Sequence, residues 1–280
     1  MVCLVRDVPV YYEEYGEGTP VLCIHGYTLD HRMMSGCLEP VFENIQGYRR
    51  IYLDLPGMGK TPSAQWIKTS DQMLEVVAGF IETVMPGINF LVAGESYGGY
   101  ITLGLIHNLR DRIDGALLIC PALKSWVMNR IEKEKLPPKQ LLWASGDMPP
   151  EEADADVKDF WQFAVIATAK IFNQYKSDIL SGIKLADQEF LYNHLDGAYS
   201  HEFEAGLRVM EFDKPTCILT GRQDHGVGYL DAFELLRRFP RASFAALDCA
   251  GHNLQVENEP VFAQMVKDWI WRVELQPKID

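Results

Sequence analysis

The 280-residue sequence lacks the features that mark several large classes of protein. No stretch approaches the roughly 18 uncharged apolar residues of a membrane-spanning helix. The N-terminal MVCLVRDVPV carries Arg6 and Asp7 where a secretory signal needs an apolar run. The six cysteines form no CxxC pair, and most lie in or beside apolar, strand-like runs, which favours reduced thiols. We therefore expect a cytoplasmic protein.

The sequence is also short of positive charge. Lys and Arg number 26 against 39 Asp and Glu, which gives a formal net charge of −13. Such a surface repels phosphate backbones and anionic lipid headgroups, so neither nucleic acid nor a membrane is an expected partner. The acidic run at residues 151–156 (EEADAD) has no histidine nearby, and we interpret it as a solvated helix face rather than a metal site.

A complete phosphate-binding loop is absent as well, although residues 54–61 (DLPGMGKT) end like one. The pattern GxxxxGK[ST] requires a glycine five residues before Gly59, and that position is Asp54. The loop must also lead directly into a helix, whereas Pro62 follows it and no helical pattern begins until about Ser70. A nucleotide-binding function is therefore disfavoured.

What the sequence does contain is an alternation of short apolar strands and amphipathic helices. Strands are predicted at residues 8–15, 21–24, 50–54, 90–93, 116–119, 216–220 and 243–247. Helices are predicted at about residues 30–44, 98–109 and 260–273, from about residue 229, and in a segment capped by Ser70. Continuously apolar strands separated by helices predict a mostly parallel sheet with helices on both faces.

The pattern changes between residues 122 and 207. This segment shows no convincing strand and is predicted to be helical, with many aromatic residues from Trp126 to Phe203. We therefore predict one α/β domain formed by residues 1–121 and 208–280, interrupted by a helical cap at residues 122–207. Most of the aromatic side chains would pack the cap onto the core, and a few would line an apolar pocket.

The strongest functional pattern is GESYG at residues 94–98, between a predicted strand and a predicted helix. On such a tight turn the residues two positions from the serine must be small, and the turn lifts the Ser96 hydroxyl clear of the sheet. The Tyr97 N–H would lie at the helix N-terminus, where it can stabilise negative charge. The pattern by itself is common and also suits a plain glycine-rich loop. We assign no chemistry to Glu95.

A serine hydroxyl needs a base to become a nucleophile, and the base needs a carboxylate to orient it. His252 follows the last predicted strand and Asp224 follows the strand before it, so both would join Ser96 at the carboxyl edge of a parallel sheet. Asp248, at the end of its strand, is a weaker candidate for the acid. His225 adjoins Asp224 too closely in the chain to be oriented by it.

These motifs resemble the α/β-hydrolase superfamily, in its lidded, carboxylesterase-like branch, over nearly the whole core. The resemblance implies an α/β-hydrolase fold, with a mostly parallel central sheet, helices on both faces and a helical cap inserted after the sixth strand. It implies a catalytic triad of Ser96, Asp224 and His252, with Ser96 on a nucleophile elbow. It also implies an oxyanion hole formed by the backbone N–H groups of Tyr97 and of Tyr27, which follows His-Gly. The DLPGMG segment resembles the family's loop after the fourth strand.

The resemblance implies hydrolysis of a small carboxylic ester through an acyl-enzyme, with no metal or organic cofactor. Related dehalogenases and epoxide hydrolases carry aspartate where this chain has Ser96, so their reactions are not expected. The turn at residues 25–28 (HGYT) departs from the longer glycine- and proline-containing turn of proline iminopeptidases. An aminopeptidase, a carbon–carbon bond hydrolase with the same triad, and a non-catalytic ligand-binding protein stay open as alternatives. The oligomeric state is not predicted.

Overall fold

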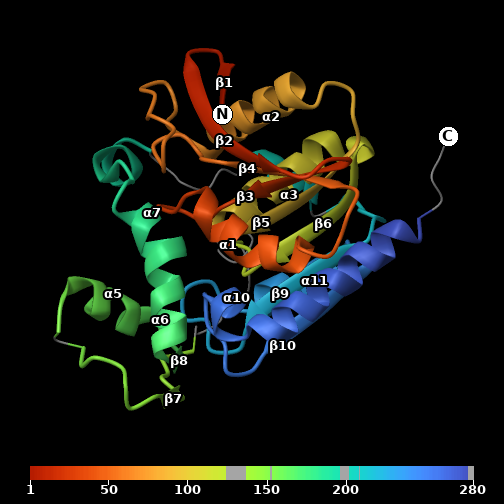
Figure 1. The fold of residues 1–280 in the computed structure, drawn as a ribbon. Coiled ribbons are helices and arrows are strands. Elements are labelled where there is room, and N and C mark those ends of the chain that lie inside the picture. The colour runs from red at the N-terminus through yellow and green to blue at the C-terminus, as the bar shows by residue number, and fades with distance from the viewer. Residues whose placement is uncertain (124–136, 152, 196–201, 208, 277–280) are drawn as a thin grey trace.

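The protein is built on one eight-stranded sheet, seen in a computed structural model that describes residues 1–123, 137–151, 153–195, 202–207 and 209–276 (Figure 1). The strands of this sheet are β1 (Val2–Val5), β2 (Val8–Tyr15), β3 (Thr19–Ile24), β4 (Tyr48–Leu53), β5 (Phe90–Glu95), β6 (Ile113–Ile119), β9 (Thr216–Gly221) and β10 (Ala242–Leu247). Their order is β1-β2-β4-β3-β5-β6-β9-β10. All neighbours pair in parallel except β1 with β2 and β2 with β4, which are antiparallel.

Helices cover both faces of this sheet (Figure 1). The longer helices are α1 (His31–Phe42), α2 (Ser70–Val84), α3 (Tyr97–Leu109), α5 (Ala155–Phe163), α6 (Ala169–Tyr175) and α11 (Glu259–Glu274). The shorter ones are α7 (Ser181–Ile183), α8 (Glu202–Leu207), α9 (Leu230–Glu234), α10 (Leu254–Glu257), η1 (Arg110–Arg112), η2 (Lys176–Leu180), η3 (Phe190–His194) and η4 (Leu235–Arg237).

Strand β3 illustrates why the central strands are apolar throughout. Its side chains alternate between the two faces of the sheet. Leu22 and Ile24 enter a core shared with α2 and α3, whereas Val21 and Cys23 enter a second core shared with α1 and α11. A strand that is buried on both faces must be apolar at successive positions, which is the pattern seen in the sequence. The predicted α/β-hydrolase arrangement of the sheet is confirmed.

The segment after β6 is mainly helical. Helices α5, α6 and α7 lie together at the left of Figure 1, and η2 packs against α1. Phe160 and Tyr175 are buried in the same core as α1 and α11, and the Tyr175 hydroxyl donates to Asp159 at 2.5 Å. The aromatic residues Trp126 and Tyr199 lie outside the described residues. The division into a core and a cap at residues 122–207 stays a prediction.

Three details differ from the sequence predictions. Strand β1 was not predicted, although Cys3 and Val5 point inward, because the polar turn that follows breaks its short alternation. Thr69, not Ser70, caps α2, by accepting a hydrogen bond from the Gln72 N–H. Two-residue strands, β7 (Trp143–Ala144) and β8 (Ile166–Ala167), pair within the segment predicted to lack strands.

Within the described residues, no helix has the length and apolar character needed to cross a bilayer.

Two tryptophans on α11 allow a matched test of the packing. Trp269 is fully buried and its Nε1–H donates to the Pro215 carbonyl at 3.0 Å, whereas Trp271 is 57% exposed. Trp269→Ala should lower the free energy of unfolding by about 3–5 kcal/mol, because it leaves a large cavity. Trp271→Ala should change it by about 0.5 kcal/mol or less. Urea unfolding of both variants measures this, and equal effects would contradict the described orientation of α11.

Candidate active site

Ser96 lies on a sharp turn between a strand and a helix. Strand β5 ends at Glu95 and α3 begins at Tyr97, so Ser96 alone separates them. Its backbone has φ +49° and ψ −114°, a strained conformation that costs about 1–3 kcal/mol and that is concentrated at functional sites. The Ser96 N–H donates to the Ile119 carbonyl at 2.9 Å, and the Ser96 carbonyl accepts from the Ala122 N–H at 3.0 Å. These contacts with the end of β6 hold the turn in place.

The glycines two positions from Ser96 are required by close backbone contacts. A Cβ atom at Gly98 would lie 2.1 Å from the Ile24 carbonyl oxygen, and one at Gly94 would lie 2.3 Å from the Gly98 carbonyl oxygen. Backbone oxygens cannot rotate out of the way as the end of a side chain can. The small residues of the GESYG pattern are therefore explained by packing, independently of any chemistry.

Asp224 lies in the loop after β9, where two backbone groups hold its carboxylate. Its Oδ1 accepts from the Gly226 N–H at 2.8 Å and from the Val227 N–H at 3.1 Å, while Oδ2 lies 2.8 Å from His252 Nδ1. Burial raises the pKa of this carboxyl, but the charge of His252 and these hydrogen bonds outweigh burial and lower the pKa to about 2. Asp224 is therefore ionised at neutral pH.

His252, in the loop after β10, connects Asp224 to Ser96. Its Nδ1 lies 2.8 Å from Asp224 Oδ2, and its Nε2 lies 3.0 Å from Ser96 Oγ. With the proton on Nδ1 directed at the carboxylate, the lone pair of Nε2 faces the serine hydroxyl. Burial lowers the pKa of His252, but the neighbouring negative charges outweigh it and raise the pKa well above its ordinary value. The structure thus brings together the three residues predicted as a triad.

The alternatives considered for the acid and the base lie elsewhere. Asp248 is exposed, and its Oδ1 accepts from Gln223 Nε2 at 2.8 Å. The His225 ring stacks on Phe163, with the ring centres 5.7 Å apart. Among the described residues, Asp224 is the carboxylate that contacts His252 Nδ1.

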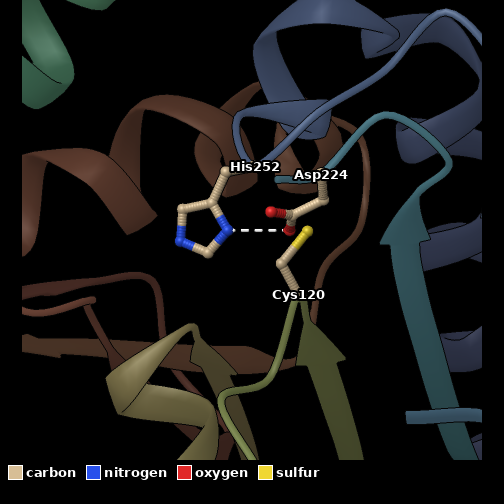
Figure 2. A group of neighbouring side chains, drawn as sticks. All are labelled: Cys120, Asp224 and His252. Carbon is tan, nitrogen blue, oxygen red and sulfur yellow. Dashed lines mark hydrogen bonds and ion pairs between the residues drawn. The ribbon is translucent and has the colours of Figure 1, made fainter. Parts of the chain in front are cut away.

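Cys120 adds a thiol to the same cluster, as Figure 2 shows. Its Sγ and one ligand atom each of Asp224 and His252 lie within 4.8 Å of one another. A metal would need a thiolate and an imidazole nitrogen free to bind it. Burial raises the pKa of the Cys120 thiol to about 12, and His252 Nδ1 is engaged with Asp224. The cluster therefore suits a hydrogen-bonded pair beside a neutral thiol better than a metal ion.

A second cluster of metal-ligand type, formed by Asp30, His31 and Asp54, is occupied by its own hydrogen bonds. Asp54 Oδ1 accepts from the His31 backbone N–H at 2.7 Å and from its ring Nδ1–H at 2.8 Å. The other oxygen, Oδ2, accepts from the Lys60 N–H at 2.8 Å. We interpret these bonds as structural, because they tie the start of α1 to the loop after β4.

That loop, residues 54–61, contains the partial phosphate-loop pattern. Gly59 has φ +55°, and a Cβ atom there would lie 2.3 Å from Asp54 Oδ2. Gly57 has φ +78°, and a Cβ atom there would lie 2.4 Å from the Phe190 ring of η3. The Gly57 carbonyl also accepts from the Asp187 N–H at 2.8 Å. The glycines therefore let the loop close on its own carboxylate and pack against the segment after β6.

The turn predicted to form the oxyanion hole follows β3 and is held by a buried histidine. His25 Nε2 accepts from the Leu55 N–H at 3.0 Å, and its Nδ1–H donates to the Gly26 carbonyl at 2.8 Å. Burial lowers the pKa of His25, so the ring is neutral. The Tyr27 ring lies edge-on to the Tyr97 ring, with centres 5.2 Å apart. The two residues of the predicted oxyanion hole are therefore neighbours.

Two carboxyl groups near His252, the buried Glu95 and the half-buried Glu257, were not predicted to contribute. Glu95 is 1% exposed, and its Oε1 lies 3.3 Å from His252 Nε2. Glu257 accepts from the Gly251 N–H at 2.6 Å through Oε2 and from the Val165 N–H at 2.6 Å through Oε1. The only signal for Glu95 was its position next to the serine, and nothing in the sequence connects Glu257 with a residue 92 positions away.

Comparison with known proteins agrees with the fold. The profile of the alpha/beta hydrolase family matches residues 21–264. An alpha/beta superfamily hydrolase from Oenococcus oeni has a structure with a TM-score of 0.85 at 29% identity, and the match covers 95% of this chain and 96% of that one.

Two named enzymes are similar to this chain along nearly their whole lengths. A pimeloyl-[acyl-carrier protein] methyl ester esterase from Shewanella oneidensis is 24% identical, over 94% of this chain and 95% of its own length. A 2-hydroxy-6-oxononadienedioate/2-hydroxy-6-oxononatrienedioate hydrolase from Burkholderia vietnamiensis is also 24% identical, over 95% of this chain and 92% of its own length. The chain belongs to the alpha/beta hydrolase family.

Replacement of Glu257 tests its two backbone contacts. Glu257→Gln should lower the free energy of unfolding by about 1–3 kcal/mol, because an amide NH₂ would then face a backbone N–H. The control is Glu259→Gln, which removes a 43% exposed partner of Lys170 and should change stability by about 0.5 kcal/mol or less. Equal unfolding midpoints in guanidinium chloride for the two variants would contradict a structural role for Glu257.

Proposed function

We propose that the protein is a serine hydrolase that cleaves small carboxylic esters through an acyl-enzyme intermediate. The observation that carries the proposal is the position of His252, with Nδ1 at 2.8 Å from Asp224 Oδ2 and Nε2 at 3.0 Å from Ser96 Oγ. A base in contact with a nucleophile on one side and an orienting carboxylate on the other is the arrangement that activates a serine.

In the first half of the reaction, Ser96 Oγ bonds to the ester carbonyl carbon while its proton passes to His252 Nε2. The carbonyl electron pair moves onto oxygen, and the N–H groups of Tyr27 and Tyr97 bind the resulting oxyanion. Two features support this role: Tyr97 begins α3, and its ring packs against that of Tyr27. Loss of one such donor typically raises the barrier by about 3–4 kcal/mol. The C–O bond then breaks, and Nε2–H protonates the leaving alcohol.

In the second half, water takes the place of the alcohol. His252 Nε2 accepts a proton as the water oxygen bonds to the acyl carbon, and it returns that proton to Ser96 Oγ when the acid leaves. Asp224 remains ionised throughout and stabilises the imidazolium formed in each half. These steps use only protein groups and water, so the proposal includes no metal or organic cofactor.

The relatives support an ester substrate and also keep an alternative open. The Shewanella oneidensis relative is named as a methyl ester esterase, which favours ester hydrolysis here. The Burkholderia vietnamiensis relative, at the same identity, favours the alternative of a carbon–carbon bond hydrolase with the same three residues. The net charge of −13 would repel a strongly anionic carrier. We therefore propose a free, small ester as the substrate.

We further propose that residues 122–207 form a cap over a core of residues 1–121 and 208–280. Contacts of Gly57 with Phe190 and with Asp187 support a position of this segment beside the site. We also propose a cytoplasmic location, which the six free cysteines support, since five of them are buried as small apolar side chains.

Removal of the nucleophile tests the mechanism. Ser96→Ala should lower kcat/KM for p-nitrophenyl acetate by about 10³-fold or more, because no other group could then form the acyl-enzyme. The matched control is Ser35→Ala, which removes a hydroxyl that contacts the Arg32 carbonyl of α1 at 3.4 Å and should leave turnover unchanged. Turnover that survives in Ser96→Ala would contradict the mechanism.

A substrate panel separates the alternatives. The purified protein is compared on p-nitrophenyl esters of increasing acyl length, a β-diketone and a prolyl amide. We expect the highest kcat/KM on a short ester. A higher value on the β-diketone would favour a carbon–carbon bond hydrolase, and one on the prolyl amide an aminopeptidase. Very slow turnover of all three, with tight retention of one ligand, would favour a non-catalytic binding protein.

A further inference from the structure

Glu95 lies on the opposite side of the His252 ring from Asp224. Its Oε1 is 3.3 Å from His252 Nε2, the same nitrogen that lies 3.0 Å from Ser96 Oγ. The imidazole therefore has a carboxyl group at each nitrogen, Asp224 at Nδ1 and Glu95 at Nε2. At Nε2, Glu95 and Ser96 compete for the same position.

The carboxyl group of Glu95 is held in this place by the fold. Glu95 is the last residue of β5, where it pairs with Ile119 of β6, and it is 1% exposed. A Cβ atom at Gly26 would lie 2.2 Å from Glu95 Oε2, so the glycine of the predicted oxyanion turn leaves the space that this carboxyl fills. Oε2 is buried and has no hydrogen-bond partner among the described residues. The Glu95 carboxyl is therefore shielded from bulk water.

A buried carboxylate of Glu95, 3.3 Å from His252 Nε2, favours the protonated, positively charged form of the histidine. Facing a neutral Nε2, an ionised Glu95 meets a lone pair and is repelled. Facing a protonated Nε2, it meets a positive charge, which stabilises the imidazolium. Burial raises the pKa of Glu95 to about 7, even though His252 acts to lower it, so this carboxyl changes charge in the pH range where the histidine must act.

We propose that Glu95 is a second acidic partner of His252, which sets the pH above which His252 can accept the Ser96 proton and stabilises the imidazolium formed during attack. This inference rests on the proposed function for its kinetic consequences. Its geometric basis, a buried carboxyl at Nε2, is independent of which bond is hydrolysed.

Other titratable groups face the same ring. Asp224 contributes a fixed negative charge at Nδ1, and the Cys120 thiol contributes none, since burial raises its pKa to about 12. His225, whose pKa is lowered by burial, acts on the ring at longer range. The half-buried Glu257, whose pKa is raised by burial, bonds to the Gly251 N–H and not to the ring. The buried Cys37 thiol lies on the α1 side of Glu95 and is kept neutral by burial, which raises its pKa. Among these groups, Glu95 is the carboxyl at Nε2.

The isosteric change Glu95→Gln should therefore alter the pH profile of kcat/KM in two linked ways. The acid limb, which follows the protonation of His252 in the free enzyme, should move to lower pH. Its pKa falls because the imidazolium loses a negative partner. The plateau at high pH should fall by about tenfold, because the imidazolium formed during attack loses the same partner. At low pH the variant has more neutral His252 than the wild type, so the two profiles should cross.

Crossing profiles distinguish this role from a structural one. The matched control is Glu257→Gln, the same change at a half-buried glutamate that contacts the Gly251 backbone and not the ring. It should lower kcat/KM by the same factor at every pH. For Glu95→Gln, an unmoved acid limb, or a uniform loss at every pH, would overturn the inference. If thermal melting shows that Glu95→Gln does not fold, Glu95→Leu replaces it, with the same expected crossing.

A second measurement does not depend on turnover. In ¹⁵N-labelled protein, the ring nitrogens of His252 are titrated by NMR and assigned by comparison with His252→Asn. The midpoint should be lower in Glu95→Gln than in the wild type, and equal midpoints would overturn the inference. If the wild type shows no turnover that depends on Ser96, the proposed function fails, and this titration alone decides whether Glu95 is a partner of His252.

Discussion

The hydrogen bond between His252 and Asp224 is the interaction on which the rest of the site depends. A buried carboxylate is costly unless hydrogen bonds and an opposite charge compensate it. Two backbone N–H groups hold Oδ1 of Asp224, which leaves Oδ2 for His252 Nδ1 at 2.8 Å. Because the bond to Asp224 fixes Nδ1 and the plane of the ring, Nε2 points toward Ser96 Oγ and the carboxyl of Glu95. The proposed chemistry follows from that direction.

Side chains that accept hydrogen bonds from backbone N–H groups of other segments hold the loops around this site. Glu257 joins the Gly251 N–H, next to His252, to the Val165 N–H in the segment after β6. His25 joins the turn after β3 to the loop after β4 through the Leu55 N–H. These bonds connect segments far apart in the chain at the carboxyl edge of one sheet, where open α/β sheets bind their ligands. Loop positions in this site are therefore coupled to one another.

The sequence predicted the part of this structure that is encoded locally. Apolar strands buried on both faces predicted the parallel sheet, and the small residues of GESYG predicted the turn that carries Ser96. Their positions after successive strands also predicted that Asp224 and His252 lie at the carboxyl edge of the sheet. In the structure, His252 is within hydrogen-bond distance of Asp224 through one ring nitrogen and of Ser96 through the other. Their catalytic roles stay proposals. The direction of the Glu95 side chain could not be predicted, because it depends on the space that Gly26 leaves, on another strand's loop.

The central claim is that His252 makes Ser96 a nucleophile. Labelling with a fluorophosphonate, followed by mass spectrometry of the digested protein, tests it most directly, because this reagent bonds to activated serines. The account predicts one adduct per chain, on the peptide that contains Ser96, and none in a His252→Asn variant. An adduct on another serine, no adduct in the wild type, or equally fast labelling of the His252→Asn variant would contradict it.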